Sequence, residues 1–220
     1  PRASASRMAD RIAAGRLIYC IGPGGHSQLA VEEMFHRAGG LANIYPLLVT
    51  YLHGPARAIL DRTPGYMDKM VKLHGFSEGD LLLVLTAYGI NAITIDACLA
   101  AQELGGEVLA VTSKSYAGIP PGDRSRHPSN KNLFELADHY IDCLMPYGDA
   151  ALDLPGVDLK VSPVSTILLF FCVECLVAET VQELVNRGLE PEIWLSGNVP
   201  NGDERNQYLM DKYSHRIKDL

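Results

Sequence analysis

A glycine cluster that joins an apolar run to a helical pattern constrains the fold of this chain more than any other feature. Residues 17–21 are apolar and predict a short buried strand, residues 22–25 predict a tight turn, and helical periodicity begins at Ser27. Such a unit directs backbone N–H groups and the positive end of a helix dipole towards one point, which suits an anion. The glycine spacing is not the G-x-G-x-x-G of a dinucleotide site, and no Gly-Lys-Ser/Thr follows as in a P-loop.

The rest of the chain continues to alternate between strand and helix patterns. Strands are predicted at residues 17–21, 81–85, 107–111, 140–142 and 192–195, and helices at residues 27–38, 91–104, 132–137, 164–187 and 202–218. This order predicts an α/β fold in which a doubly wound, five-stranded parallel sheet carries helices on both faces. We expect ligands to bind beyond the carboxyl ends of the strands, as they do in such sheets.

Two segments lie outside this alternation. Residues 1–16 predict an N-terminal helical arm, and residues 45–76 form a long connection with one helix near 56–60 and another near 66–74. A connection of this length usually carries function or an interface. Because no shift in composition marks a boundary, the whole chain, residues 1–220, is expected to be one domain.

Charge, hydropathy and cysteine content exclude several classes of function. The formal net charge of −7 argues against a nucleic-acid partner, which requires a basic face. No apolar run approaches the roughly 20 residues of a membrane helix, and residues 1–16 lack the apolar centre of a signal peptide. The five scattered cysteines are typical of free thiols in a reducing cytoplasm, and the Cys172/Cys175 pair in an apolar helix favours small buried side chains over a redox or zinc site. We therefore expect a cytoplasmic protein with no metal or cofactor, no nucleic-acid partner and no membrane contact.

Several short motifs follow one another along nearly the whole chain, among them Gly22-x-Gly24-x-His26-Ser27, Asn91-Ala-x-x-Ile-Asp96, Thr112-Ser113, Arg-His-Pro-Ser-Asn-Lys at 126–131, and Gly148-Asp149-Ala150. This ordered series resembles the sugar isomerase (SIS) domain family, in particular its small stand-alone phosphosugar-binding branch. The resemblance implies an SIS-type fold and a sugar or sugar phosphate as ligand. With the outward apolar residues of the predicted helix 164–187, it also implies a homodimer or homotetramer with sites at the subunit interface.

Glu32 and Glu33 are the first candidates for a catalytic base. Because they are adjacent in a predicted helix, they point in different directions. A pair of glutamates on a helix is more often a solvated surface, but the resemblance implies that a glutamate of this helix takes a proton next to the sugar carbonyl. We assign that role to Glu33.

Two histidines lie among polar residues. His26 stands at a predicted helix start, where the dipole disfavours the imidazolium, so we expect a neutral side chain that polarises a carbonyl or caps the helix. His127 lies in a loop between Arg126 and Lys131, whose charges discourage protonation and suit His127 to acid/base use. Both histidines join Glu33 as candidate catalytic residues.

The candidate ligand-binding residues supply hydroxyl, amide and backbone N–H donors, which can hold a phosphate without an obligatory Lys or Arg. Most of them lie in the polar loops that follow the first three predicted strands. Lys131 is included as a charge partner, and Asn206 is expected to come from a neighbouring subunit. The set comprises Gly24, Gly25, Ser27, Thr86, Tyr88, Asn91, Thr112, Ser113, Ser115, Lys131 and Asn206.

At Tyr88 the chain departs from the family that it resembles. The usual second loop reads Ser-x-Ser-Gly, but here Tyr replaces the second Ser, and Pro23 alters the first loop. If the Tyr88 ring fills the phosphate subsite, a compact or non-phosphorylated substrate is favoured. If the ring swings out, Thr86, the Gly89 N–H and Ser113 hold a phosphate. We favour the first alternative, because two changes fall on one subsite.

These residues and the resemblance predict an isomerase that interconverts an aldose and a ketose of a phosphorylated sugar by abstracting a proton next to the carbonyl. Two alternatives stay open. A lyase of the dehydratase or etherase type, acting on an amino-sugar phosphate, begins with the same proton abstraction. A sugar-phosphate-binding module without catalysis uses the same pocket, and it would not exchange substrate hydrogen with deuterated water.

Overall fold

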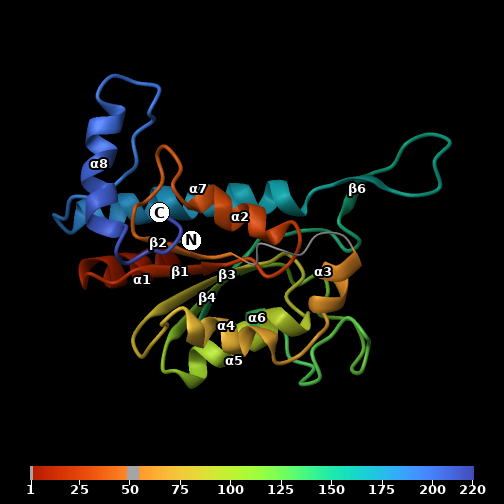
Figure 1. Ribbon diagram of the computed structural model, residues 1–220. Helices are drawn as coiled ribbons and strands as arrows, with labels where there is room; N and C mark the ends of the chain where they lie inside the picture. The colour runs from red at the N-terminus through yellow and green to blue at the C-terminus, as the bar shows by residue number, and fades with distance from the viewer. Residues whose placement is uncertain (1, 49–54) are drawn as a thin grey trace.

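The computed structural model describes residues 2–48 and 55–220, and its centre is a sheet of five parallel strands in the order β2-β1-β3-β4-β5 (Figure 1). The strands are β1 (Ile18–Ile21), β2 (Ile44–Leu47), β3 (Leu81–Leu85), β4 (Glu107–Thr112) and β5 (His139–Asp142). β1 and β3 are buried along their whole length, as parallel strands covered on both faces should be. The predicted α/β fold with a five-stranded parallel sheet is confirmed.

Successive side chains of the strands enter two separate hydrophobic layers. In β1, Ile18 and Cys20 belong to one layer, whereas Tyr19 and Ile21 belong to the other. Both layers are fully buried around this strand, and β1 pairs with a strand on each side, so it is an interior strand of the sheet. The residues that follow β1 are therefore held in a fixed position by packing on both sides.

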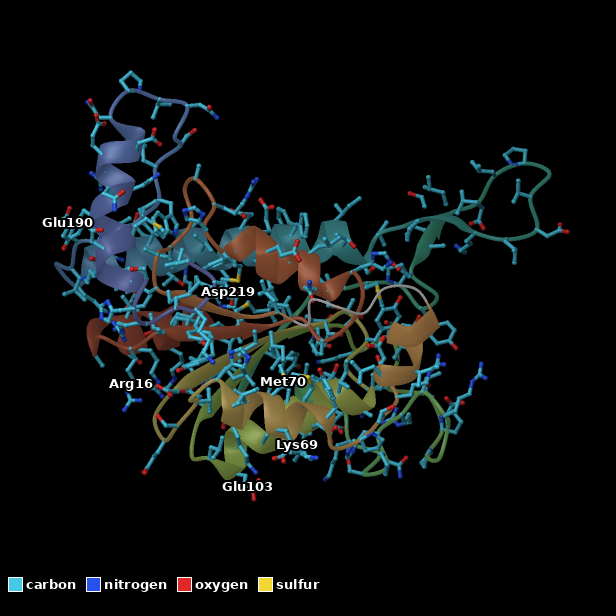
Figure 2. The ribbon with its side chains drawn as sticks, viewed as in Figure 1. Arg16, Lys69, Met70, Glu103, Glu190 and Asp219 are labelled. Atoms are coloured by element: carbon cyan, nitrogen blue, oxygen red, sulfur yellow. The ribbon has the colours of Figure 1, made fainter. Side chains whose placement is uncertain are left out.

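Helices cover both layers. The layer that contains Ile18 is covered by α1 (Arg2–Ala13), α2 (Ser27–Met34) and α7 (Ser165–Asn186). The opposite layer is covered by α4 (Tyr66–Leu73), α5 (Ala92–Glu103) and the short α6 (Leu133–Leu136). Figure 2 labels Lys69 and Met70 on α4 and Glu103 on α5, which lie together below the sheet in that view.

One predicted strand is wrong, and a strand that was not predicted takes its place. Residues 192–195 form only an isolated antiparallel bridge, between Ile193 and Leu41, whereas one edge of the sheet is β2, which overlaps the start of the connection 45–76. Pro46 interrupts the apolar pattern of β2 and hides it from sequence analysis. Because β2 pairs only with β1, its outer edge needs no ladder of N–H donors and tolerates proline.

Other boundaries differ in detail. The connection 45–76 also holds α3 (Pro55–Leu60) and α4, and residues 49–54, which include His53, lie outside the described residues. α2 ends at Met34 rather than at residue 38, because Phe35 is extended and His36 adopts a left-handed φ of 51°. α8 (Gly202–Tyr213) also ends earlier than predicted.

An antiparallel hairpin that the sequence did not predict projects from the body of the protein. It is formed by β6 (Ala150–Leu152) and β7 (Val161–Pro163), just before α7. In Figure 1 it extends away from the sheet on the right. Leu152 and Leu159 are exposed on this arm.

The strand order creates a switch point between β1 and β3. The chain leaves β1 into α2, on one layer of the sheet, and leaves β3 into α5, on the other. Connections that diverge in this way leave a crevice beyond the carboxyl ends of the two strands, where ligands bind in sheets of this order. The glycine loop of residues 22–25 lies at that crevice.

Candidate functional site

A cavity of about 510 Å³ lies at this switch point, between the loops after β1 and β3, residues 58–62, and the first turn of α7. Seven of the residues that the sequence predicted line it: Gly24, Gly25, His26, Ser27, Thr86, Tyr88 and Asn91. Further walls come from Asp61, Arg62, Tyr116, Ser125 and Ser165. The cavity therefore gathers polar groups from segments that are far apart in the sequence.

The glycine loop brings β1 against the first turn of α2. A Cβ atom on Gly22 would lie 2.1 Å from the carbonyl oxygen of Ser27, so only glycine fits at that position. The backbone N–H groups of Gly25, His26 and Ser27 have no hydrogen-bond acceptor among the described residues, and the His26 side chain does not cap the helix. These groups and the helix dipole are available to an anion.

Two hydroxyl groups face the same cavity. Thr86 is only 2% exposed, and its N–H is fixed by a bond of 2.9 Å to the carbonyl oxygen of Val111. Within the described part of the chain, neither the Thr86 hydroxyl nor that of Ser27 has a hydrogen-bond partner. Both can donate to a bound molecule.

Tyr88 forms a wall of the cavity and is held there by Asp149. The Tyr88 hydroxyl donates to Asp149 Oδ2 at 3.3 Å, and the ring packs edge-on against Tyr116 with centroids 4.8 Å apart. Burial and the charge of Asp149 raise the pKa of Tyr88 well above its ordinary value, so the hydroxyl stays a donor. The bond to Asp149 and the contact with Tyr116 therefore hold the ring in the cavity wall.

Asp149 also fixes the first turn of α7. Its Oδ1 accepts the N–H groups of Val164 and Ser165 at 2.9 and 2.7 Å, and its Oδ2 accepts the Ser165 hydroxyl at 2.9 Å. A carboxylate at a helix N-terminus satisfies free N–H groups and complements the dipole. Asp149 thus occupies the anion-attracting end of α7, whereas no side chain caps the N-terminal end of α2.

Arg62 is the only lysine or arginine that lines this cavity among the described residues. Its side chain is exposed, and it forms no ion pair or side-chain hydrogen bond with the described part of the chain. Asn91, which also lines the cavity, precedes α5 and donates to the carbonyl oxygen of Ser125 at 3.0 Å. The Arg62 guanidinium is therefore available to a ligand, whereas the Asn91 amide already donates to the Ser125 carbonyl oxygen.

Glu33 does not line the cavity of its own chain. Its carboxylate pairs with Arg37 at 3.3 Å, and its charge contributes, after burial, to a raised pKa of Glu174 on α7. Glu32 is exposed and accepts a bond of 2.9 Å from Gln28. Both glutamates therefore lie on the outer surface formed by α2 and α7.

His127 is likewise absent from the cavity wall. Its Nδ1 accepts the Ser129 N–H at 3.0 Å, so its Nε2 carries the proton and donates to Asp96 Oδ1 at 3.1 Å. Asp96 Oδ2 accepts the Gly65 N–H at 2.6 Å. His127 therefore ties the loop after β4 to α5 and to the turn before α4.

The hydroxyls of Ser113 and Ser115, which follow β4, bond within the protein, whereas the Thr112 hydroxyl at the end of β4 has no partner among the described residues. Ser113 is 3% exposed, donates to the carbonyl oxygen of Met145 at 2.9 Å, and accepts the Ser115 N–H at 3.2 Å. The Thr112 hydroxyl is buried, 2.5 Å from where a Cβ of Gly89 would lie, and Gly89 has a left-handed φ of 63°. None of these residues lines the cavity.

The last two predicted ligands are also remote from the cavity within one chain. Lys131 is exposed in the loop before α6. Asn206, on α8, bonds twice to the backbone of Leu195, accepting its N–H at 2.9 Å and donating to its carbonyl oxygen at 2.7 Å. Asn206 therefore fixes the segment before α8 in the structure as it stands.

Comparison with known proteins identifies the family of this chain. The model of the SIS domain family matches residues 2–113. A UPF0309 protein of Listeria innocua is 36% identical over 216 residues, which cover 96% of this chain and 86% of that protein. The chain belongs to the SIS-domain family. A UPF0309 protein of Streptomyces griseus is 35% identical over 221 residues, covering 98% of this SIS domain protein and 86% of the relative.

Solved structures similar to this SIS-domain chain share less of its sequence. A phosphoheptose isomerase from Francisella tularensis is 18% identical with a TM-score of 0.45, and the match covers 82% of this chain and 84% of that one. The sugar isomerase domain of an RpiR transcription factor from Sphaerobacter thermophilus is 17% identical with a TM-score of 0.45, covering 96% and 86%.

Sequence reasoning missed three residues of this SIS-domain cavity and its support. Arg62 lies in the connection 45–76, where no motif marks it. Asp149 and Tyr116 follow later strands, and only the three-dimensional structure brings them to Tyr88. The Gly148-Asp149-Ala150 motif was a signal that this turn matters, but not of what it contacts.

The cysteines of the SIS domain are all unpaired. Burial raises the pKa of the Cys98 thiol to about 12 and that of Cys143 to about 11, so these thiols stay protonated at neutral pH. In the described ranges, no group of three or more His, Cys, Asp or Glu side chains is arranged to hold a metal ion. Likewise, no helix within residues 2–48 and 55–220 combines the length and apolarity needed to span a bilayer.

Proposed function

We propose that the switch-point cavity binds a phosphorylated sugar and that the protein is a sugar isomerase-like enzyme. The observation that carries this proposal is the convergence of donors that have no partner among the described residues: the N–H groups of Gly25, His26 and Ser27, the hydroxyls of Ser27 and Thr86, and the Arg62 guanidinium. A phosphate dianion requires several donors from different directions, which this group of residues supplies. Membership of the SIS-domain family supports a sugar as the remainder of the ligand.

The substrate is proposed to be compact. Tyr88 lines the cavity and is tied to Asp149, which agrees with a ring that fills part of the phosphate subsite. If the Tyr88 ring swung out of the subsite, Gly89 and Ser113 would have to help hold the phosphate, but neither residue lines the cavity. A short phosphosugar fits this geometry better than a hexose 6-phosphate.

The proposed chemistry is aldose–ketose isomerisation. A base takes the proton from the hydroxyl-bearing carbon next to the carbonyl while an acid protonates the carbonyl oxygen, which gives an enediol. The protonated base then delivers a proton to the former carbonyl carbon, and the neighbouring enediol hydroxyl gives up its proton as it becomes the new carbonyl. His26 lines the cavity and is proposed as one of the two proton carriers. The other is proposed to be Glu33, which in its own chain faces outwards.

Glu33 is proposed to act in the cavity of a second copy. Its neighbour Glu174 shares a face of α7 with Ile167 and Phe171, which are 66% and 68% exposed. Large apolar side chains on one exposed helix face are typical of an interface. A homodimer or homotetramer that buries this face would bring Glu33 to another subunit.

Mixing two inactive variants tests this arrangement. We expect His26→Gln and Glu33→Gln to be inactive alone and to recover about a quarter of wild-type activity when their subunits are exchanged, because half of the dimers are mixed and have one intact site of two. Exchange without recovery would place both residues in one chain's site. Sedimentation that finds only a 24.0 kDa monomer would contradict the shared site altogether.

A sugar-phosphate-binding module is the second candidate, and the position of Glu33 outside its own cavity favours it. Incubation with phosphosugars in deuterated water separates the two functions. An isomerase incorporates deuterium at the carbon next to the carbonyl, as detected by mass spectrometry. Saturable binding without any deuterium incorporation would support the module and reject the isomerase.

A further inference from the structure

A second cavity, of about 600 Å³, lies beside the segments that precede β1 and β2, at the amino ends of the strands. It lies between the C-terminal end of α1, residues 189–193 and α8, and in Figure 1 α8 stands at the end of the molecule remote from α3. Glu190, labelled beside α8 in Figure 2, belongs to its wall. No residue lines both cavities, so this one is separate from the proposed sugar site.

A buried polar network forms one wall of this second cavity. Asn43, just before β2, is 5% exposed and lines the cavity with Glu192, Tyr213 and Lys212. The Tyr213 hydroxyl bonds to Glu192 Oε2, and Lys212 Nζ lies 2.6 Å from Glu192 Oε1. Burial alone would raise the pKa of Glu192, but the bonds from Lys212 and Tyr213 outweigh it and lower that pKa, so Glu192 is an ionised acceptor at neutral pH.

The donors and acceptors of this network fix the orientation of the Asn43 amide. Because Glu192 only accepts, the Tyr213 hydroxyl donates to it and must accept from Asn43. Asn43 Nδ2 accordingly donates to Tyr213 at 2.5 Å and to Glu192 at 3.5 Å, which uses both of its N–H groups. Asn43 Oδ1 is left buried with no partner among the described residues. A buried acceptor of this kind is costly unless another group donates to it.

Unpaired charges and apolar side chains complete the wall. Arg205 and Glu190 line the cavity, and neither forms an ion pair or side-chain hydrogen bond with the described residues. Leu184, Leu189 and Leu209 provide apolar surface between them. The cavity therefore combines a free cation, a buried acceptor and an apolar lining.

We propose that this second cavity binds a small carboxylic acid that carries an amine or hydroxyl on the neighbouring carbon and an apolar side chain. The carboxylate pairs with Arg205, the amine or hydroxyl donates to Asn43 Oδ1, and the side chain packs on the leucines. An amine gains a further contact with Glu190, whereas a hydroxyl does not. This proposal is independent of the sugar site.

Four probes of similar size test the three requirements. L-leucine and 2-hydroxy-4-methylpentanoate have the carboxylate, the donor and the side chain, whereas 4-methylpentanoate lacks the donor and 3-methylbutylamine lacks the carboxylate. By calorimetry on the whole chain, we expect one of the first two to bind at least about 10-fold more tightly than both of the others, since each loses a charge-assisted or buried hydrogen bond. The Asn43 side-chain amide resonances should shift in NMR spectra only with the tighter ligand.

Two arginine variants locate the binding. We expect Arg205→Gln to weaken the tighter probe about 10-fold, and the control Arg62→Gln, in the other cavity, to leave it unchanged. Four probes that bind equally weakly, or an Arg205→Gln variant with unchanged affinity, would overturn the proposal. Weakening by Arg62→Gln instead would assign the probe to the sugar site and overturn it as well.

Discussion

The loops after β1 and β3 and the loop after β4 carry similar hydroxyl residues at one edge of the sheet, but they use them in different ways. Ser27 and Thr86 keep their hydroxyls unpartnered among the described residues and line the cavity. Ser113 instead bonds to Met145 and Ser115, and buried Arg126 holds its own loop through carbonyl oxygens and Asn132 Oδ1. We call the first two loops open, because their hydroxyls can bond a ligand, and the third closed, because Ser113 and Arg126 bond within it, although its Tyr116 and Ser125 also line the cavity.

The difference follows from the strand order. The chain leaves β1 and β3 towards opposite layers, and the cavity lies beyond the carboxyl ends of these two strands. β4 lies one strand further, beside β5, and the residues after β5 supply the Met145 carbonyl that Ser113 bonds. A polar residue after a strand therefore predicts a ligand contact only where neighbouring connections diverge.

The largest expected effect is on turnover, from removal of the proposed base on α2, the helix that follows the loop after β1. Glu33→Gln should lower turnover by about 10²- to 10⁴-fold, the usual contribution of a general base, while phosphosugar affinity stays unchanged. Glu32→Gln is the matched control, since Glu32 bonds only to Gln28 among the described residues and should keep its activity. An equal loss in both variants, or none in Glu33→Gln, would remove Glu33 from the catalytic role.

A smaller effect is expected from Arg62, the only lysine or arginine that lines the cavity among the described residues. Arg62→Gln should weaken phosphosugar binding by about 10- to 100-fold, because it removes a charge-assisted hydrogen bond. Lys131→Gln, in the closed loop, is the control and should change affinity little. The comparison between loops would fail if calorimetry found the larger loss for Lys131→Gln.

Two hydroxyl deletions compare the open and closed loops directly. Thr86→Val should weaken the phosphosugar about 5- to 20-fold and leave the melting temperature near that of the wild type, since the hydroxyl has no partner in the described protein. Ser113→Ala should do the reverse and cost about 1–3 kcal/mol of unfolding free energy, because it strands buried groups of Met145 and Ser115. Ser113→Ala with wild-type stability and weaker binding would show that the β4 loop is also open.

The smallest effect concerns specificity. Tyr88→Ser should enlarge the phosphate subsite and improve the binding of hexose 6-phosphates relative to shorter phosphosugars by about 3- to 10-fold, as expected for relief of a steric restriction. Tyr88→Phe is the control, because it keeps the ring and removes only the bond to Asp149. Tight wild-type binding of a hexose phosphate that Tyr88→Ser leaves unimproved would show that the ring does not restrict the site.

The sequence predicted the sheet, the glycine loop and the loops after β1 and β3, because apolar runs and glycine turns are local signals. It missed β2, since Pro46 is tolerated only by an edge strand and the edge is a property of the whole sheet. It assigned Ser113 and Ser115 to the ligand-binding set and His127 to the catalytic residues, because the bonds that hold them come from segments distant in the sequence or from their own loop geometry. Arg62 and Asp149 have no local pattern, so only the fold brings them to the cavity and its support.

The most direct test of the phosphate site compares one compact sugar with and without its phosphate. Calorimetric titration of erythrose 4-phosphate and erythrose into the wild type and Thr86→Val measures the contribution of the free donors. We expect the phosphate to tighten wild-type binding by about 100-fold or more, and Thr86→Val to weaken only the phosphorylated ligand. Equal affinities for the two sugars, unaffected by Thr86→Val, would contradict a phosphate site at the switch point of the sheet.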